Sequence, residues 1–183
     1  MPQRALAEAF DGDTPLFQSK LETLHAAWDA KCAPGQLPKW SDFSARDLKS
    51  WLPNIAVIDR IGDPPRFKVR LMGTGCVRIG GKDYTGCWVD ETAHHISRKG
   101  IEDAYRQCLT SKKAIFRRVE YVKERMVRAT VYRLFMPCLD ADGLPNIVLA
   151  GVYKIEEFGQ YFELPEQLIE KVIVEPTQTV VLL

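Results

Sequence analysis

The sequence predicts an α+β fold, namely a five-stranded antiparallel sheet with helices on one face and an N-terminal helical extension. Residues 54–73 and 114–157 alternate apolar with polar side chains, as half-buried strands do. The stretch between them, and the one after residue 14, instead repeat apolar residues at helical spacing. Short connections favour antiparallel neighbours, and the helical middle must cover the apolar face of the sheet. We divide the chain into an N-terminal helical extension (1–36), one domain (37–160) and a C-terminal tail (161–183).

The first helix is expected to begin at Thr14-Pro15, because a capping hydroxyl precedes a proline whose missing N–H costs nothing at the first helical position. It should stop before Pro34-Gly35. Its apolar residues form one stripe, which must cover the outer face of the sheet or pair between two chains, because an isolated helix cannot leave such a stripe in water. These residues are Phe17, Leu21, Leu24 and Trp28.

A second, shorter helix is predicted from Ser44 to Leu52. Ser44, with Asp47 three residues later, is a variant of the capping box that marks a helix start. The helix should end at Leu52, since Pro53 disfavours the helical conformation of its predecessor.

The strand pattern begins at Asn54. NIAVIDRI and RFKVRLMG flank the turn GDPP and predict a hairpin in which Phe67, Val69 and Leu71 share one face. A helix with its apolar stripe at residues 101–109 follows. Three further strands in a meander complete the sheet, and their sequences are AIFRRVEYVKE, MVRATVYRLFMPCL and NIVLAGVYKIEE.

The glycine-rich stretch GTGCVRIGGKDYTG, residues 73–86, is not a phosphate-binding loop. Gly81 stands where the phosphate loop requires lysine, and Arg78 stands where the dinucleotide fingerprint requires glycine. We expect the glycines to bend the chain from a strand into the helical middle, and two side chains to cap the next turn. The residues concerned are Gly73, Gly75, Gly80 and Gly81, with Asp83 and Thr85 as caps.

Composition excludes several classes of protein. The 183 residues carry 25 basic and 24 acidic side chains, whereas a nucleic-acid-binding surface normally brings a basic excess. No apolar run approaches the roughly 20 residues that span a bilayer, and the N-terminus lacks the apolar core of a signal peptide. Five scattered cysteines without a C-x-x-C pair, and the adjacent His94 and His95, predict neither disulfides nor a metal site. We expect a cytoplasmic protein.

Three segments, SDFSARDLKSWLPNIAVID, RFKVRLMGTG and GKDYTGCWVDE, resemble a group of stand-alone bacterial PAS-like proteins over roughly residues 37–157. The G-x-D-x-T-G element is the most specific part of the resemblance. The resemblance implies a PAS-like sheet. It also implies a sensory or signalling module that binds a small molecule or a partner protein and is not an enzyme. Since about 26 residues follow Glu157, we expect no output domain in this chain. Output would then pass to a separate signalling protein or to a second copy in a homo-oligomer.

A PAS-type ligand site would lie between the sheet and the helical middle. Its apolar walls with a few hydroxyl groups suit a small, mostly apolar ligand, although each residue also suits a plain core. Haem would need His94 or His95 as its axial ligand, and the surroundings of Cys76 do not resemble a flavin photoreceptor, so neither cofactor is expected. The expected lining residues are Val69, Leu71, Trp88, Tyr105, Tyr121, Phe135 and Tyr153.

Two other functions stay open at this stage. One is a small α+β barrel enzyme of the isomerase or dehydratase type with Asp59 or Asp90 as its base, which a buried carboxylate of raised pKa would support. The other is an interaction adaptor without a ligand.

A basic run predicts either a solvated edge strand or a surface that meets an acidic partner or an anionic second messenger. It comprises Lys112, Lys113, Arg117, Arg118, Lys123, Arg125 and Arg128.

Overall fold

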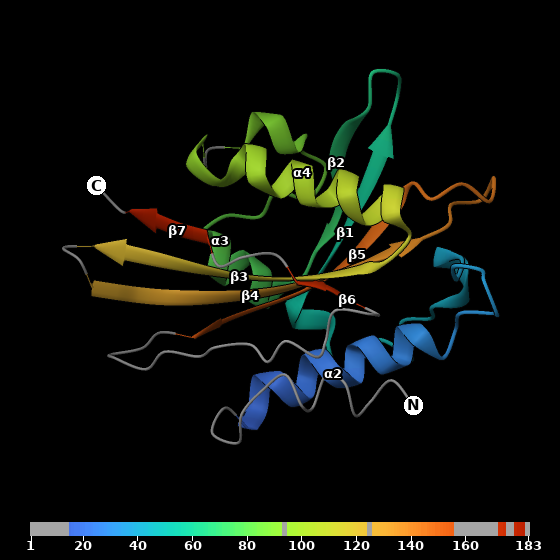
Figure 1. The fold of residues 1–183 in the computed structure, drawn as a ribbon, viewed down its shortest axis with the longest axis horizontal. Coiled ribbons are helices and arrows are strands. Elements are labelled where there is room, and N and C mark those ends of the chain that lie inside the picture. Colours follow the sequence, from blue (N-terminus) through green and yellow to red (C-terminus); the bar gives the residue numbers. More distant parts are fainter. Residues whose placement is uncertain (1–14, 93–94, 124–125, 156–171, 175–177, 182–183) are drawn as a thin grey trace.

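The fold was analysed in a computed structural model, which describes residues 15–92, 95–123, 126–155, 172–174 and 178–181 (Figure 1). Side chains are described within 20–92, 100–120 and 130–154. The helices are α2 (Pro15–Asp29), α3 (Thr74–Gly80) and α4 (His95–Ser111), with 3-10 turns η1 (Trp40–Asp42), η2 (Leu52–Asn54) and η3 (Val89–Glu91). The strands are β1 (Ile55–Ile61), β2 (Arg66–Met72), β3 (Ala114–Lys123), β4 (Met126–Cys138), β5 (Ile147–Ile155), β6 (Val172–Val174) and β7 (Gln178–Val181).

The sheet confirms the predicted α+β fold. Its antiparallel part runs in the order β2-β1-β5-β4-β3, so that β4 and β5 lie inside it. Beyond β3, the short strands β6 and β7 pair with β3 in parallel. The sequence analysis did not anticipate these two, because three or four residues are too few to show a strand period. Strand β3 is therefore not the free edge that its charges suggested.

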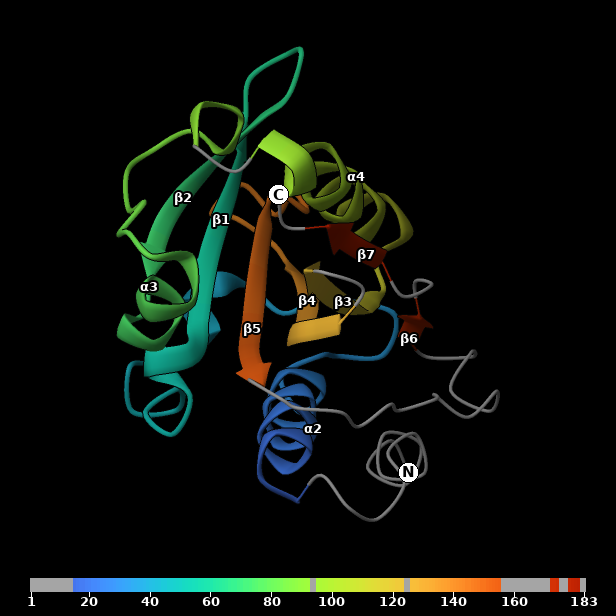
Figure 2. The same cartoon turned by 90° about the vertical axis from the view of Figure 1, so that its left-hand side faces the viewer.

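Helices lie on both sides of the sheet. Helices α3 and α4 lie on one side and α2 on the other, as Figures 1 and 2 show. Side chains of a strand point alternately to opposite faces, so β4 and β5 supply two separate buried clusters. We call the two sides of the sheet the α4 face and the α2 face.

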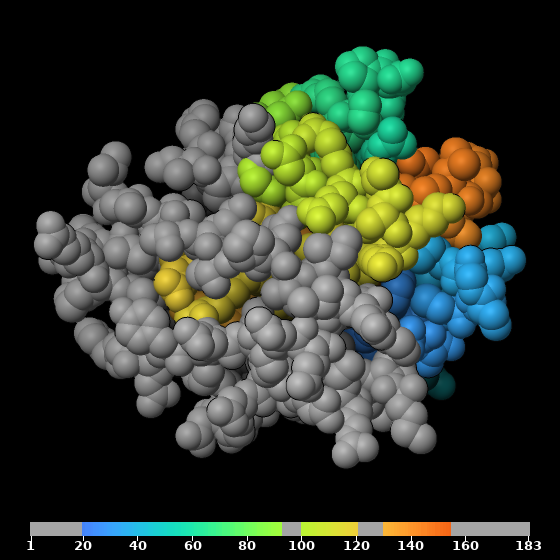
Figure 3. Space-filling view, viewed as in Figure 1, coloured from blue at the N-terminus to red at the C-terminus, as the bar shows by residue number. Residues whose placement is uncertain are grey.

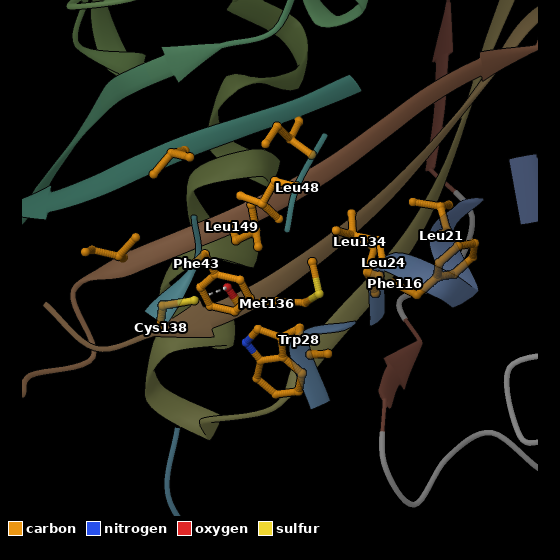
Figure 4. Close-up of a cluster of buried hydrophobic side chains, with 14 of the residues drawn as sticks. Leu21, Leu24, Trp28, Phe43, Leu48, Phe116, Leu134, Met136, Cys138 and Leu149 are labelled. Carbon is orange, nitrogen blue, oxygen red and sulfur yellow. Dashed lines mark hydrogen bonds between the residues drawn. The ribbon is translucent and has the colours of Figure 1, made fainter. Parts of the chain in front are cut away.

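The stripe of the first helix covers the outer sheet face, as one of its two predicted roles required. Leu21, Leu24 and Trp28 are buried against β4 and β5 (Figure 4), and Trp28 Nε1 donates to the Pro137 carbonyl at 3.0 Å. The side chain of Phe17 lies outside the described residues. Burying such side chains stabilises the fold by about 1.5–3 kcal/mol each, so α2 is part of the core.

Gly151 determines how closely α2 approaches β5. A Cβ at this position would lie 2.7 Å from Leu24 Cδ2 and 2.9 Å from Leu21 Cδ2, nearer than carbon atoms approach without repulsion. The missing side chain therefore lets the helix settle directly on the strand.

The predicted helix from Ser44 to Leu52 is wrong, although its cap is present. Ser44 N donates to Asp47 Oδ2 at 2.9 Å and Asp47 N to Ser44 Oγ at 3.2 Å. The following residues form turns in which three- and four-residue hydrogen bonds are mixed, and the segment ends in η2. The capping pattern specifies only the start of the segment, and it does not require a regular helix to follow.

The glycine-rich stretch folds mostly as α3. A side chain at Gly73 would overlap the carbonyl oxygens of Leu52 and Pro53, so the close approach of two backbone segments requires this glycine. Gly81 ends the helix with φ 75°, where glycine carries no steric penalty. Of the two predicted caps, Asp83 caps the turn after the helix, since Thr85 N donates to Asp83 Oδ1 at 2.8 Å.

The space-filling view shows the positions of two turns, the β1–β2 hairpin tip and the β4–β5 turn (Figure 3). The tip of the β1–β2 hairpin stands out beside α4. At another end, the segment after α2 lies beside the β4–β5 turn, where Trp40 N donates to the Leu139 carbonyl at 2.9 Å. This bond attaches the connection after α2 to the sheet.

The contact between Gly151 and Leu24 can be tested with a double-mutant cycle. We expect Gly151→Val to lower the free energy of unfolding by about 1–3 kcal/mol through overpacking, and Leu24→Ala to lower it by about 2–5 kcal/mol. In the double variant the valine occupies space that the leucine vacates. The free energy of unfolding that the double variant loses, measured by urea denaturation, should be smaller than the sum of the losses of the two single variants by at least about 0.5 kcal/mol. Additive losses would contradict the contact.

Candidate functional site

The α4 face carries an aromatic centre below α4. Tyr105 of α4 places its ring 5.4 Å from that of Phe67 and 5.1 Å from that of Phe135, with an edge-to-face contact to the latter. Such edge contacts between rings are favourable. The buried apolar residues that surround this centre are Ile58, Val69, Ala104, Cys108, Leu109, Ile115, Val148 and Ala150.

Tyr105 brings a hydroxyl group into this apolar region. The residue is 5% exposed, and burial raises the pKa of its hydroxyl well above the usual range. Positive charge on Arg133 and Arg117 acts in the opposite direction on the same pKa. The burial of this hydroxyl is the larger of these two effects.

Two arginines of the basic run, Arg117 and Arg118, are buried, so the prediction of a solvated edge is wrong for them. Arg117 is 1% and Arg118 6% exposed. Arg117 Nη1 donates to the carbonyl of Gly100 at 2.7 Å and so attaches α4 to β3. Arg118, one residue later and hence on the other face, forms an ion pair with Glu120. A buried charge is costly unless it is paired or hydrogen-bonded. The contacts with Gly100 and Glu120 offset this cost for Arg117 and Arg118, respectively.

Three cations lie on neighbouring strands of the α4 face. Arg117 of β3 pairs in register with Arg133 of β4, so their side chains leave the same face directly opposite each other. Lys154 of β5 is paired with Val131, two residues from Arg133, and points to the same face. Arg133 and Lys154 are half-buried, so this end of the face is nearer to solvent than the aromatic centre. We call these three residues the basic end.

Three of the predicted lining residues come together as expected. Val69, Tyr105 and Phe135 all belong to the buried cluster of the α4 face. The side chain of Tyr121 lies outside the described residues, although its backbone is part of β3.

Leu71 does not point inward with Val69, and this prediction is wrong. The pairing of β1 with β2 shifts at Val57/Ile58, so that Ile58 faces Val69 while Val57 faces Leu71. The extra residue of the bulge reverses the alternation, and Leu71 is left 36% exposed. Met72 packs against the α4-face cluster in its place.

The predicted inward positions of Trp88 and Tyr153 are also wrong. Trp88 lies half-buried beside β2, with the Arg66 guanidinium 4.3 Å from its ring centroid. This is a favourable cation–π contact, and it lies outside the buried cluster of the α4 face. Tyr153 is buried in the α2-face cluster, opposite Tyr132 of β4. Alternation along β5 places it there, because Val152 is the residue that packs against the α4-face cluster.

The carboxylates proposed as catalytic bases form ion pairs. Asp59 accepts from Arg70 at 2.9 Å, and Asp90 accepts two hydrogen bonds of 2.7 Å from Arg66. Each carboxylate thus faces a guanidinium, whereas a general base of raised pKa needs an apolar pocket. Their placement gives the isomerase-like alternative no support.

The buried thiols are neutral rather than reactive. Burial raises the pKa of Cys76 to about 12, although the charge of Arg133 acts in the opposite direction. Cys108 and Cys138 are also buried, and their pKa values are raised for the same reason. Across the residues that the structure describes, no three His, Cys, Asp or Glu side chains gather as a metal site would require. The side chains of His94 and His95 fall outside those residues.

A sheet with five antiparallel strands and helices packed on its faces is an α+β architecture. A sequence model of the PAS domain family matches residues 16–153, and the chain therefore belongs to this family. PAS domains are sensory and signalling modules and are generally not catalytic. No curated protein matches the chain. Within the described residues, no helix is long and apolar enough to cross a membrane.

The burial of the Tyr105 hydroxyl predicts a loss of stability in alkali. Unfolded tyrosine ionises near pH 10, whereas the folded pKa of Tyr105 lies higher, so above about pH 10 the unfolded state loses the proton first. The contribution to the free energy of unfolding should then fall by up to about 1.4 kcal/mol per pH unit. Tyr105→Phe should flatten this fall in urea titrations, because the ring contacts remain.

Tyr84→Phe is the matched control, since Tyr84 is only half-buried. An equal flattening in both variants would contradict a special role for the Tyr105 environment.

Proposed function

We propose that this PAS domain is a cytoplasmic sensor in which a small molecule binds on the α4 face and the change is read by a separate signalling protein or a second copy of the chain. The observation that supports it best is the aromatic centre of Phe67, Tyr105 and Phe135 beside the basic end. Apolar walls with a few polar groups at one side are the usual composition of a small-molecule site. Binding, rather than turnover, is the proposed activity.

The sheet offers a direct route for the signal. Arg117 attaches α4 to β3 on one face, and Trp28 attaches α2 to β4 on the other. Because β4 and β5 contribute side chains to both buried clusters, a shift of α4 alters the packing under α2. A partner that contacts α2 would therefore respond to a ligand on the opposite face.

The adaptor without a ligand is the second candidate. The close ring packing of Tyr105 against Phe67 and Phe135 favours it, because rings in contact leave little space between them. On this alternative the domain transmits partner binding alone, and small molecules should leave the α4 face unchanged.

A blocked variant distinguishes the two candidates. Val69 is 7% exposed within the α4-face cluster, so Val69→Trp should fill the space that a ligand would use. Overpacking of this kind costs about 1–3 kcal/mol, which the fold should survive. In a fragment screen followed by two-dimensional NMR, hits should shift the signals of Phe67, Tyr105 and Phe135 in the wild type but not in Val69→Trp.

Leu144→Trp is the control, because Leu144 is 54% exposed in the β4–β5 turn and is not part of the buried cluster of the α4 face. It should bind like the wild type. A screen without a single hit on the α4 face would refute the sensor and leave the adaptor.

A further inference from the structure

We propose that two copies of this chain associate through the C-terminal edge of the sheet, which consists of β6 and β7, with β7 of one copy paired antiparallel to β7 of the other. This inference goes beyond the proposed function, because it concerns a surface other than the α4 face and requires no ligand. It states where a second copy would join the sheet.

The two short strands β6 and β7 form one margin of the sheet, opposite β2 (Figure 2). β6 pairs with residues 114–116 of β3, and β7 pairs with residues 119–122. Among the strands that the structure describes, β3 is the one neighbour of each. Their backbone N–H and C=O groups that do not bond to β3 therefore point outward, and such a row of groups is a template for a further strand.

The β2 margin, in contrast, is protected from edge pairing in two ways. Val69 N donates to the Cys87 carbonyl at 2.9 Å and Gly86 N donates to the Val69 carbonyl at 2.7 Å, so a segment of the same chain already occupies part of this edge. The strand also carries the exposed Arg66 and Arg70, and charged side chains on an edge oppose pairing with another chain. Association through a sheet edge is thereby directed to the C-terminal edge.

The sequence of the C-terminal edge lacks comparable protection along β7. Residues 172–183 read VIVEPTQTVVLL, in which the single charged residue is Glu175 and the single proline is Pro176. Both belong to the interval 175–177 that separates β6 from β7. β7 itself reads QTVV, with neither a charge nor a proline, and β-branched residues favour strands. β7 is therefore the part of this edge best suited to accept another strand.

A second copy suits this edge because β7 is complementary to itself. Two identical strands that pair antiparallel about a two-fold axis place donors opposite acceptors on both copies, and an uncharged strand does not repel its own copy. Since the β2 margin is protected, the contact ends at a dimer and does not continue into a fibre. A strand of four residues makes a small interface, so we expect a weak dimer with a Kd on the order of 100 µM.

Two measurements on the full-length protein test the association and its location. Sedimentation equilibrium from about 5 µM to about 1 mM should show monomer and dimer in exchange, without larger species. In a sample mixed from ¹⁵N-labelled and ¹³C-labelled copies, isotope-filtered NMR should detect contacts between β7 of one copy and β7 of the other. A protein that is monomeric over the whole range, or contacts that join other surfaces, would overturn the proposal.

Charge variants at Thr179, inside β7, test the pairing by complementation. Thr179→Lys and Thr179→Glu should each weaken the dimer by about tenfold or more, because like charges are then brought together on two paired edges. An equimolar mixture of the two variants should restore association, since lysine then lies near glutamate. Leu144→Lys and Leu144→Glu are the matched controls, because Leu144 is 54% exposed in the β4–β5 turn, and both should dimerise like the wild type.

Recovery in the mixture separates the proposed contact from damage to β7, because a strand lost from both variants would not return when they are combined. A dimer that persists in both Thr179 variants would place the interface elsewhere and overturn the proposal, as would a dimer weakened equally by the Leu144 variants. These results are independent of the α4 face, so the fragment screen still decides whether the domain is a sensor. If β7 does not pair, the sensor would be read by a separate signalling protein.

Discussion

The central strands β4 and β5 have both faces buried, and the rest of the molecule is arranged around that constraint. Each strand alternates its side chains between two clusters, so two layers of helix are needed to keep them from water. Helix α2 covers one face and α4 covers the other. Gly151 lets α2 pack closely on β5, and the hydrogen bond from Arg117 to the Gly100 carbonyl attaches α4 to β3. The same two strands therefore contribute to the packing of both helices.

The same constraint explains the position of the candidate site. Where α4 covers the sheet completely, the face is filled by the rings of Tyr105, Phe67 and Phe135. Toward Arg133 and Lys154 the cover is less complete, and the side chains become cationic. Along β4, the α4 face thus changes from the aromatic ring of Phe135 to the guanidinium of Arg133.

Local patterns predicted most of the secondary structure, since hydrophobic period and turn chemistry act within a few residues. The hairpin of β1 and β2, helix α4 and the three strands β3 to β5 follow those patterns. The segment from Ser44 to Leu52 was predicted wrongly, because a correct cap marks where a helix can start but does not show that a regular helix follows. Of the expected lining residues, Leu71 failed because a bulge adds one residue to the alternation, and a bulge has no sign in a period-two pattern.

The sequence by itself determined the fold class, the resemblance to PAS domains and the apolar stripe of α2, because each depends on residue types at fixed spacings along the chain. Only the tertiary structure decided which charges are buried. Arg117 and Arg118 occur in a charged run that is typical of an exposed edge, yet α4, β6 and β7 enclose β3. Likewise, the pairing of Arg117 with Arg133 depends on the register between strands. Burial and register arise from contacts between distant segments, and the local pattern of either strand does not contain them.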